Sequence, residues 1–434
     1  MRRRIRSTPA PDARHPADAG APPLARLRWL GGSAATVLLL GSLLLSGPGL
    51  LISTVNRVGY NLLYDFRGGL YNAGVAILHG RTPYRPGFLA HQAALLHAGH
   101  LAIGETATHS FSIPVYPALA NVLVVPFSAL PFWVAGLIYT LLSAAAMVVG
   151  IRLLGVRDRR CLALVVISWP FLFGAFLGAI GPFLVLGAGA AWRWRDRIGP
   201  PALALATIIA VKIFPWTLAV WLLITRRYRA LAACTAAGIL LTFGAWALIG
   251  FDGLARYPQM LSNMSFIQED RSVSIVGVLV IAGVSSTVAT AVAMLLGAGI
   301  LILAWRLRHG PDGDRRAFGL AVLAALTATP IVWEHYMVLL FIPIALASPR
   351  FSAAWLIPLC TPIIEAASWI IPASRLDAPF SPNLLRSAGP WLFLELLTGV
   401  VLCTTPVQRR SVWLRLRRLP GSLAAGPEGA AEPA

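Results

Sequence analysis

"FWVAGLIYTLLSAAAMVVG", residues 132–150, is an apolar stretch without a single charged side chain. A helix needs about 20 such residues to cross the hydrocarbon core of a bilayer. Similar runs recur along the chain, in which 57% of the residues are hydrophobic and only 12% are charged. This composition excludes an ordinary soluble protein and indicates an all-α polytopic membrane protein.

Short arginine clusters separate the apolar runs and predict their sidedness. Of the 36 Lys and Arg residues, 27 lie in these clusters and in the two termini, and the positive-inside rule assigns them to the cytoplasm. The net charge of +19 does not indicate a nucleic-acid partner, because no ribbon of basic and aromatic residues is present. An apolar run with cytoplasmic arginines at both ends must cross an even number of times. Three hairpins follow, at 161–192, 199–225 and 317–348.

The outer turns of these hairpins are expected at 178–182, 212–215 and 329–336, and two shorter apolar pieces, 113–130 and 273–284, are expected to be re-entrant or interfacial. Single crossings complete a helical bundle of roughly 10–12 spans with both termini in the cytoplasm; they are predicted at Trp29 to Ile52, 132–150, 230–251, 286–305, 352–371 and 389–406.

The chain divides into one membrane domain and two tails. Residues 1–28 form a basic cytoplasmic tail expected to be disordered, and 407–434 form a basic and then disordered cytoplasmic tail. The membrane domain covers 29–406, and 52–131 is its long first extracytoplasmic loop. The four cysteines lie in apolar segments without ligand spacing and predict neither a disulfide framework nor a zinc site.

Asp65 is a carboxylate in that first loop, flanked by Tyr64 and Phe66. Beside aromatic rings at a membrane surface, desolvation raises the pKa of a carboxyl group and suits it to general-base catalysis. The alternative is that Asp65 caps the amphipathic helix that follows, although Gly68 and Gly69 open a helix poorly. Arg67, Tyr71 and Tyr84 of the same loop are candidate substrate-binding residues.

Lys212 is the single lysine of the protein and lies within an apolar run, "IIAVKIFPW". A cation buried in a bilayer is costly unless it is paired, so an anionic phosphate is its expected partner. The alternative is that the side chain reaches the interface at the hairpin turn without a functional partner.

The stretch "TPIVWEHYMV" places Glu334 and His335 at another outer turn. Trp333 and Tyr336 are explained by the aromatic belt of membrane proteins, but the acid and the imidazole beside them are not. His335 is a candidate for holding a phosphate oxygen or for relaying a proton, and Trp333, Glu334 and Tyr336 are candidate substrate-binding residues.

The Glu269-Asp270 pair is best interpreted as a solvated turn, with Mg²⁺ or Mn²⁺ binding left open as an alternative. No cofactor is otherwise indicated. Five histidines of the first loop lack the grouping of a zinc enzyme, and most of them are interpreted as surface residues: His79, His91, His97, His100 and His109.

Several segments in order resemble glycosyltransferase family 87, over roughly residues 29–406. They are the loop with Asp65, "YNAGVAILHGRTPY", "IPVYPALANVLVVPFSALP", "ALATIIAVKIFPWTLAVWLLITRRYRA" and "ATPIVWEHYMVLL". The resemblance implies the GT-C membrane architecture and a polyprenol-phosphate-sugar-dependent transferase, in most members a mannosyltransferase. It assigns the catalytic base to Asp65 and donor phosphate binding to Lys212 and His335. The chain departs from the family pattern at "GAIGP", 178–182, and "SVSIVG", 272–277.

We therefore expect an inverting transfer of a hexose, with mannose implied by the resemblance, to an extracytoplasmic hydroxyl of a lipid- or glycan-linked acceptor. The enzyme is expected in the plasma membrane, with its site on the extracytoplasmic side and a role in building cell-envelope lipoglycans. No nucleotide-binding motif is present, so the chain is not expected to be a nucleotide-driven pump. The rival function is a glycolipid flippase or transporter without chemistry, which would favour internal repeats.

Overall fold

The computed structural model describes residues 62–93, 115–269, 272–310, 312–360 and 381–405, with the backbone alone for 359–360 and 381–391. Throughout these residues the regular elements are helices, and no strand occurs among them. The all-α class predicted from the sequence is confirmed.

Within the described ranges, three helices are long and apolar enough to cross a membrane: α5 (Phe132–Leu153), α11 (Tyr228–Leu248) and α14 (Ser286–Leu307). They match the predicted crossings at 132–150, 230–251 and 286–305 to within a few residues. A fourth span is formed if α6 (Arg159–Ile167) and α7 (Trp169–Leu177), which meet at an angle of 49°, are taken together. Leucines such as Leu137, Leu141 and Leu295 project from these helices with most of their surface exposed, as expected for contact with lipid.

Fewer described helices meet the length for a full crossing than the 10–12 spans predicted, because the remaining ones are short or interrupted. The shorter helices of the bundle are α8 (Gly181–Arg193), α9 (Gly199–Val211), α10 (Thr217–Ile224), α15 (Gly313–Ala328) and α16 (Phe341–Ala347). Helix α18 (Ser381–Thr404) has 24 residues, of which Leu392–Thr404 form a shorter apolar helix. Three 3₁₀ segments join or extend them: η2 (Phe214–Trp216), η4 (Glu334–Leu340) and η5 (Ala353–Cys360).

One end of the bundle is held together by arginine contacts, and we call it the arginine end. Arg195, which precedes α9, and Arg227, which follows α10, both contact Asp314 at the start of α15, at 3.2 and 2.7 Å. Arg315 donates a hydrogen bond to the carbonyl of Leu346 at the end of α16. The segments 199–225 and 317–348 therefore each begin and end at the same end of the bundle, as expected for hairpins.

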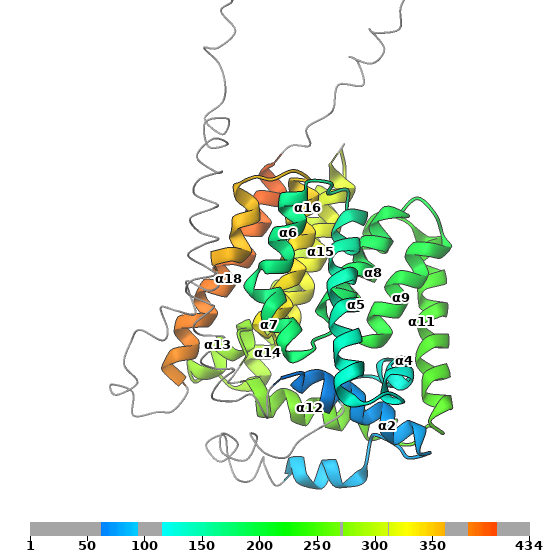
Figure 1. Ribbon diagram of the computed structural model, residues 1–434. Coiled ribbons are helices and arrows are strands. Elements are labelled where there is room, and N and C mark those ends of the chain that lie inside the picture. Colours follow the sequence, from blue (N-terminus) through cyan, green and yellow to red (C-terminus); the bar gives the residue numbers. More distant parts are fainter. Residues whose placement is uncertain (1–61, 94–114, 270–271, 311, 361–380, 406–434) are drawn as a thin grey trace, which may run out of the picture.

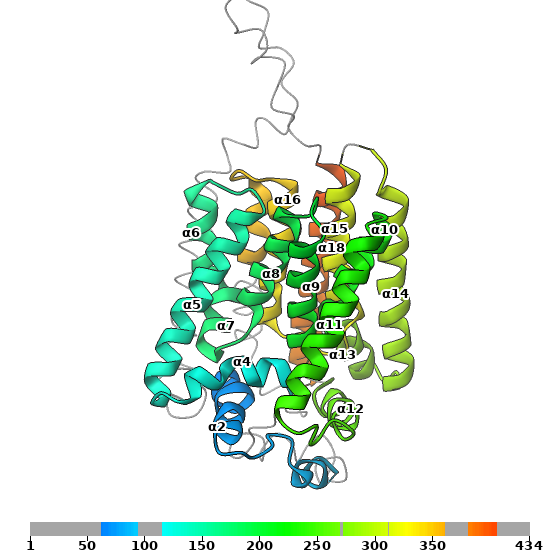
Figure 2. The same ribbon diagram turned by 90° about the vertical axis from the view of Figure 1, so that its right-hand side faces the viewer.

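The opposite end, which we call the Asp65 end, collects the hairpin turns and the short helices. Gly178, with φ of +71°, ends α7, and Lys212 ends α9. Figure 1 and Figure 2 both show α2 and α12 at this end, with α4 beside α2. The segments here are η1, a π-helix (Asp65–Tyr71), α2 (Asn72–Leu78), α4 (Ala118–Ser128), α12 (Tyr257–Gln268) and α13 (Ile275–Ile281).

The centre of the bundle is the hairpin of α15, η4 and α16. Every residue of α16 is buried, as is every residue of α15 except Asp314 and Arg316. The sequence predicts this hairpin correctly, but its position at the core follows only from the packing of α8, α10, α14 and α18 around it. His335, on η4, is thus held within this buried hairpin.

Some predicted boundaries are wrong or fall elsewhere. The last crossing was expected to begin at Gly389, yet α18 starts at Ser381 and continues through Gly389 and Pro390. Of the predicted crossing at 352–371, only η5 is described. The tails at 1–28 and 407–434, the first span from Trp29 to Ile52, and His97, His100, His109 and Asp270 lie outside the described residues.

Candidate functional site

Asp65 is the first residue of η1, and its position depends on the turn between α7 and α8. The backbone N–H of Leu63 donates to the carbonyl of Phe176 at 2.7 Å. Gly178 lies so close to Phe66 that a Cβ at this position would be 2.5 Å from the Cβ of Phe66. A left-handed glycine is required here both by its φ and by this contact.

The helix-capping alternative for Asp65 is wrong. Tyr64 already has helical backbone angles, and the start of η1 has no side-chain cap hydrogen bond. Gly68 and Gly69 do not interrupt the helix, which widens into π geometry across them. The carboxylate instead faces His335, whose Nε2 lies 3.8 Å from Oδ2 of Asp65.

Lys212 lies at the turn of the α9–α10 hairpin. Its backbone is extended, with φ of −150° and ψ of 117°, so α9 stops here, before Pro215. The ammonium lies over the ring of Tyr336 at 4.1 Å and over that of Tyr116 at 5.0 Å. Phe214, two residues on, stacks against Tyr336 with ring centroids 5.4 Å apart.

His335 is only 3% exposed. Its Cβ packs within 3.3 Å of the position that a Cβ on Gly174 of α7 would take, so this helix fixes its place. Its ring is 4.7 Å from that of Tyr336. Within the described part of the chain, Nδ1 has no hydrogen-bond partner, which leaves this buried nitrogen available to a bound group.

The environment of Asp65 alters its basicity. Its side chain is 27% exposed, so it reaches open space, yet the surrounding protein desolvates it. Desolvation raises the pKa of Asp65 from 3.8 to about 6, against the opposing effect of Lys212. A carboxylate with this pKa is a stronger base than an exposed aspartate and is still ionised at neutral pH.

Asp65, Lys212 and His335, with the aromatic rings around them, form a group that we call the ionisable cluster. The remaining candidates lie either in this cluster or around it. Tyr336 belongs to the cluster, and Glu334 accepts a hydrogen bond from the indole of Trp169 at 3.2 Å. The guanidinium of Arg67 is exposed over the Phe132 ring, at 4.4 Å. Trp333 is half-buried and packs against the core.

Tyr71 and Tyr84 are used in folding contacts. The hydroxyl of Tyr71 donates to the Leu130 carbonyl at 2.7 Å. Tyr84 is fully buried, and its ring packs against Trp246. The side chain of Tyr84 has no accessible surface in this structure, which gives no support to the prediction that it contacts substrate.

Glu269 is not the solvated residue expected from the sequence. It is buried and accepts a hydrogen bond from the hydroxyl of Ser286 at 2.6 Å. Among the described residues no three His, Cys, Asp or Glu side chains group in a way that could hold a metal ion. The alternative of a Mg²⁺ or Mn²⁺ site at this pair gains no support from Glu269.

Two tyrosines of the cluster were missed at the sequence level. Tyr116 precedes Pro117 at the start of α4, within a segment already singled out for its resemblance. Tyr139 is the one tyrosine in the apolar run of α5, is 5% exposed, and has a hydroxyl without a partner among the described residues. Its ring lies 4.4 Å from that of Phe66, next to Asp65. A polar aromatic side chain inside a spanning segment is the signal that could have found it.

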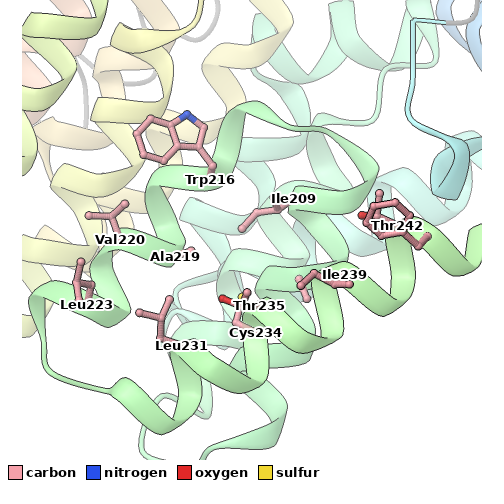
Figure 3. Close-up of a pocket in the computed structure, with 13 residues that line it drawn as sticks. Ile209, Trp216, Ala219, Val220, Leu223, Leu231, Cys234, Thr235, Ile239 and Thr242 are labelled. Atoms are coloured by element: carbon pink, nitrogen blue, oxygen red, sulfur yellow. The ribbon is translucent and has the colours of Figure 1, made fainter. Parts of the chain in front are cut away.

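An apolar groove lies between α9, α10 and α11 (Figure 3). Side chains such as Ile209, Trp216 and Phe243 line it, and Asp65, Lys212 and His335 do not. The groove supplies no chemistry, so the ionisable cluster is the candidate active site.

The fold and this cluster define the chain as a helical membrane protein with a polar site at one end of its bundle. The model of glycosyltransferase family 87 matches residues 115–332, half of the chain, and the chain belongs to this family. It is therefore a membrane glycosyltransferase. The match includes Lys212, whereas Asp65 and His335 lie outside it.

One curated relative is the polyprenol-phosphate-mannose-dependent alpha-(1-2)-phosphatidylinositol pentamannoside mannosyltransferase of Mycolicibacterium smegmatis. It is 26% identical to the chain over 311 residues, which are 66% of this chain and 69% of the relative. No solved structure matches the chain.

Proposed function

We propose that the enzyme transfers a hexose from a polyprenyl-phosphate-linked donor to an acceptor hydroxyl, with inversion at the anomeric carbon. The observation that carries this proposal is the convergence of Asp65, Lys212 and His335 from η1, the α9–α10 turn and η4. A base and groups suited to a phosphate are thus gathered at one end of an apolar bundle.

Asp65 is the general base of the proposed reaction. It takes the proton of the acceptor hydroxyl while that oxygen forms a bond to the anomeric carbon. The bond between this carbon and the phosphate oxygen breaks, and the electron pair leaves with polyprenyl phosphate. A β-linked donor then gives an α-linked product. Such a positioned base contributes about 10²–10⁴-fold to the rate.

Lys212 and His335 bind the leaving phosphate. The leaving polyprenyl phosphate is a stable anion, so it does not have to be protonated by an acid. Its negative charge has to be stabilised, however, in a site where water is scarce. The Lys212 ammonium supplies the charge, and Nδ1 of the buried His335 is open to a polar partner. Because Nε2 of His335 lies near Asp65, the histidine has a second proposed role, in which it relays the proton that Asp65 takes from the acceptor hydroxyl.

Mannose is the sugar that the relative's name supports, since that protein uses polyprenol-phosphate mannose. For this chain we propose the same donor and an acceptor hydroxyl on a lipid-linked or glycan-linked molecule. Its place in the cell is then the synthesis of an envelope glycolipid.

The proposed orientation puts the Asp65 end on the extracytoplasmic side. Arginines crowd the opposite end, which supports a cytoplasmic location for that end and for both termini. A cysteine at position 212, in a background without native cysteines, should react with a membrane-impermeant thiol reagent added from outside. Labelling only from the cytoplasmic side would contradict this orientation.

Purified enzyme in detergent, with membrane lipids of the producing cells as acceptor, tests the function. Radiolabel should pass from polyprenyl-phosphate mannose to a new lipid product, and nucleotide-linked mannose should not replace the donor. Movement of the intact donor across a proteoliposome bilayer without a new product would instead support the flippase alternative.

A further inference from the structure

The cationic head of Lys212 is held by aromatic rings and not by a carboxylate. Its Nζ lies 4.1 Å from the centroid of Tyr336 and 5.0 Å from that of Tyr116. Within the described residues Lys212 forms no ion pair, although Asp65 is near enough to influence it electrostatically. A cation over a ring face is stabilised without being neutralised.

Tyr116 also contacts the helix that carries Asp65. A Cβ placed on Gly69 of η1 would meet the edge of the Tyr116 ring at 2.8 Å. Gly69 lies four residues after Asp65, close to one turn of a π-helix. The ring of Tyr116 therefore touches both η1, the helix that begins with Asp65, and the Lys212 ammonium.

A buried hydrogen-bond chain fixes Tyr116 in this place. The Tyr84 hydroxyl donates to the Tyr116 carbonyl at 2.7 Å, and the Asn121 amide donates to the Tyr84 hydroxyl at 2.8 Å. The Tyr257 hydroxyl donates to the neighbouring Val115 carbonyl at 3.1 Å. Tyr84 and Tyr257 from other segments, with Asn121 from α4 itself, thus hold the backbone around Tyr116.

We propose that Tyr116 and Tyr336 are positioning residues that hold the Lys212 ammonium by their ring faces and keep it from pairing with Asp65. The proposal rests on the proposed function, in which Lys212 binds the donor phosphate and Asp65 is the base. It adds a reason why the two opposite charges of one site do not neutralise each other before substrate arrives.

The alternative arrangement would impair both roles. A direct Lys212–Asp65 ion pair would lower the pKa of Asp65, because an opposite charge within about 4–6 Å favours the ionised carboxylate by about 1–3 pH units. The base would be weaker, and the ammonium would have to leave its partner before it could bind a phosphate. If Lys212 formed a salt bridge, breaking it would cost free energy when the donor phosphate binds. Ring contacts leave the ammonium charged and make this cost smaller.

The test replaces Tyr116 by Leu and, as the matched variant, by Phe. Loss of the ring should raise KM for polyprenyl-phosphate mannose about tenfold, which corresponds to one desolvated cation–π contact. It should also move the acidic limb of the pH profile of kcat/KM down by about 1–2 pH units, as Lys212 pairs with Asp65. Tyr116→Phe keeps the ring face and should restore both values.

A second variant protects the test against a folding defect. Gly69→Ala pushes the Tyr116 ring away from η1 without removing it, and should give part of the same shift. The other groups that influence Asp65 or lie close to it are His335, Tyr64, Tyr139, Tyr336 and Arg67, and all remain unchanged in these variants. Melting curves of each variant show whether it is folded.

An unchanged donor KM and an unchanged acidic limb in folded Tyr116→Leu would overturn the inference. Asp65→Asn, assayed in parallel, separates this result from failure of the proposed function. If Asp65→Asn is inactive while Tyr116→Leu behaves as the parent enzyme does, the base stands and only the role of the rings is lost. If Asp65→Asn is fully active, the role of Asp65 as the base fails, and if the parent enzyme itself transfers no sugar, the proposed function fails.

Discussion

Nε2 of His335 lies 3.8 Å from Oδ2 of Asp65, although the two residues come from opposite halves of the chain. Helix α7 brings them together with two glycines. Gly174 makes room for the Cβ of His335, and Gly178 makes room for Phe66, the residue after Asp65. The closeness of these two residues therefore depends on the absence of side chains at Gly174 of α7 and at Gly178, which ends this helix.

Gly178→Ala should disrupt the site. The new Cβ would meet Phe66 at 2.5 Å and would also strain a backbone with φ of +71°. We expect a loss of stability of about 2 kcal/mol or more and a large loss of transfer activity. Gly80→Ala is the control, because Gly80 has φ of +65° and no neighbour within 4 Å. Equal effects of the two changes on melting temperature and activity would contradict the role of the Phe66 contact.

Lys212→Met should weaken the use of donor. A charge-assisted contact to phosphate is worth about 1.5–3 kcal/mol, so kcat/KM for polyprenyl-phosphate mannose should fall about 10–150-fold. Folding should survive, since the change removes an unpaired charge from an apolar region. Lys212→Arg keeps the charge and should recover part of the activity. Full activity in Lys212→Met would remove the lysine from the phosphate site.

Asp314 should be important for stability and not for chemistry. It accepts from Arg227 and from the indole of Trp221, and it also pairs with Arg195. Asp314→Ala leaves these donors without their shared acceptor, which should lower the free energy of unfolding by about 1–3 kcal/mol and lower the melting temperature. Asp196→Ala is the control, because this side chain is 81% exposed and its contact with Arg227 is long, at 3.9 Å. A melting temperature lowered equally by both changes would argue against the cluster.

Activity should depend on pH through Asp65. The base has to be ionised, and desolvation raises its pKa to about 6. As pH falls through this value the carboxylate becomes protonated, so kcat/KM should decline about tenfold per pH unit below it. Enzyme held at low pH and then assayed at neutral pH controls for unfolding. An acidic limb near the ordinary value of 3.8 would show that the base is not desolvated.

The long helices and the convergence of the site could be predicted from the sequence for physical reasons. Apolar length identifies α5, α11 and α14, and the arginine clusters identify which turns share an end. Asp65, Lys212 and His335 were visible because an ionisable side chain is rare in such surroundings. Their convergence follows if the turns that carry them meet at one end of the bundle.

Other features depend on contacts between distant segments and could not be predicted. The π-helix through Gly68 and Gly69 packs at Gly69 against the ring of Tyr116, which is distant in sequence, so local propensity does not record this contact. In the sequence Tyr84 resembles a loop tyrosine, whereas in the structure its ring packs against Trp246 and its hydroxyl accepts a hydrogen bond from Asn121. Gly389 and Pro390 indicated a helix start, yet α18 continues through them.

The most direct test of the account is the rate of mannose transfer by Asp65→Asn, measured beside Asp252→Asn with radiolabelled polyprenyl-phosphate mannose. Asn has the size of Asp but cannot accept the acceptor proton, so the rate should fall about 10²–10⁴-fold with little change in donor KM. Asp252 is an exposed carboxylate in the turn after α11, paired with Arg256 at 2.7 Å, and its variant should keep the parent rate. Undiminished transfer by folded Asp65→Asn would contradict the claim that Asp65 is the catalytic base.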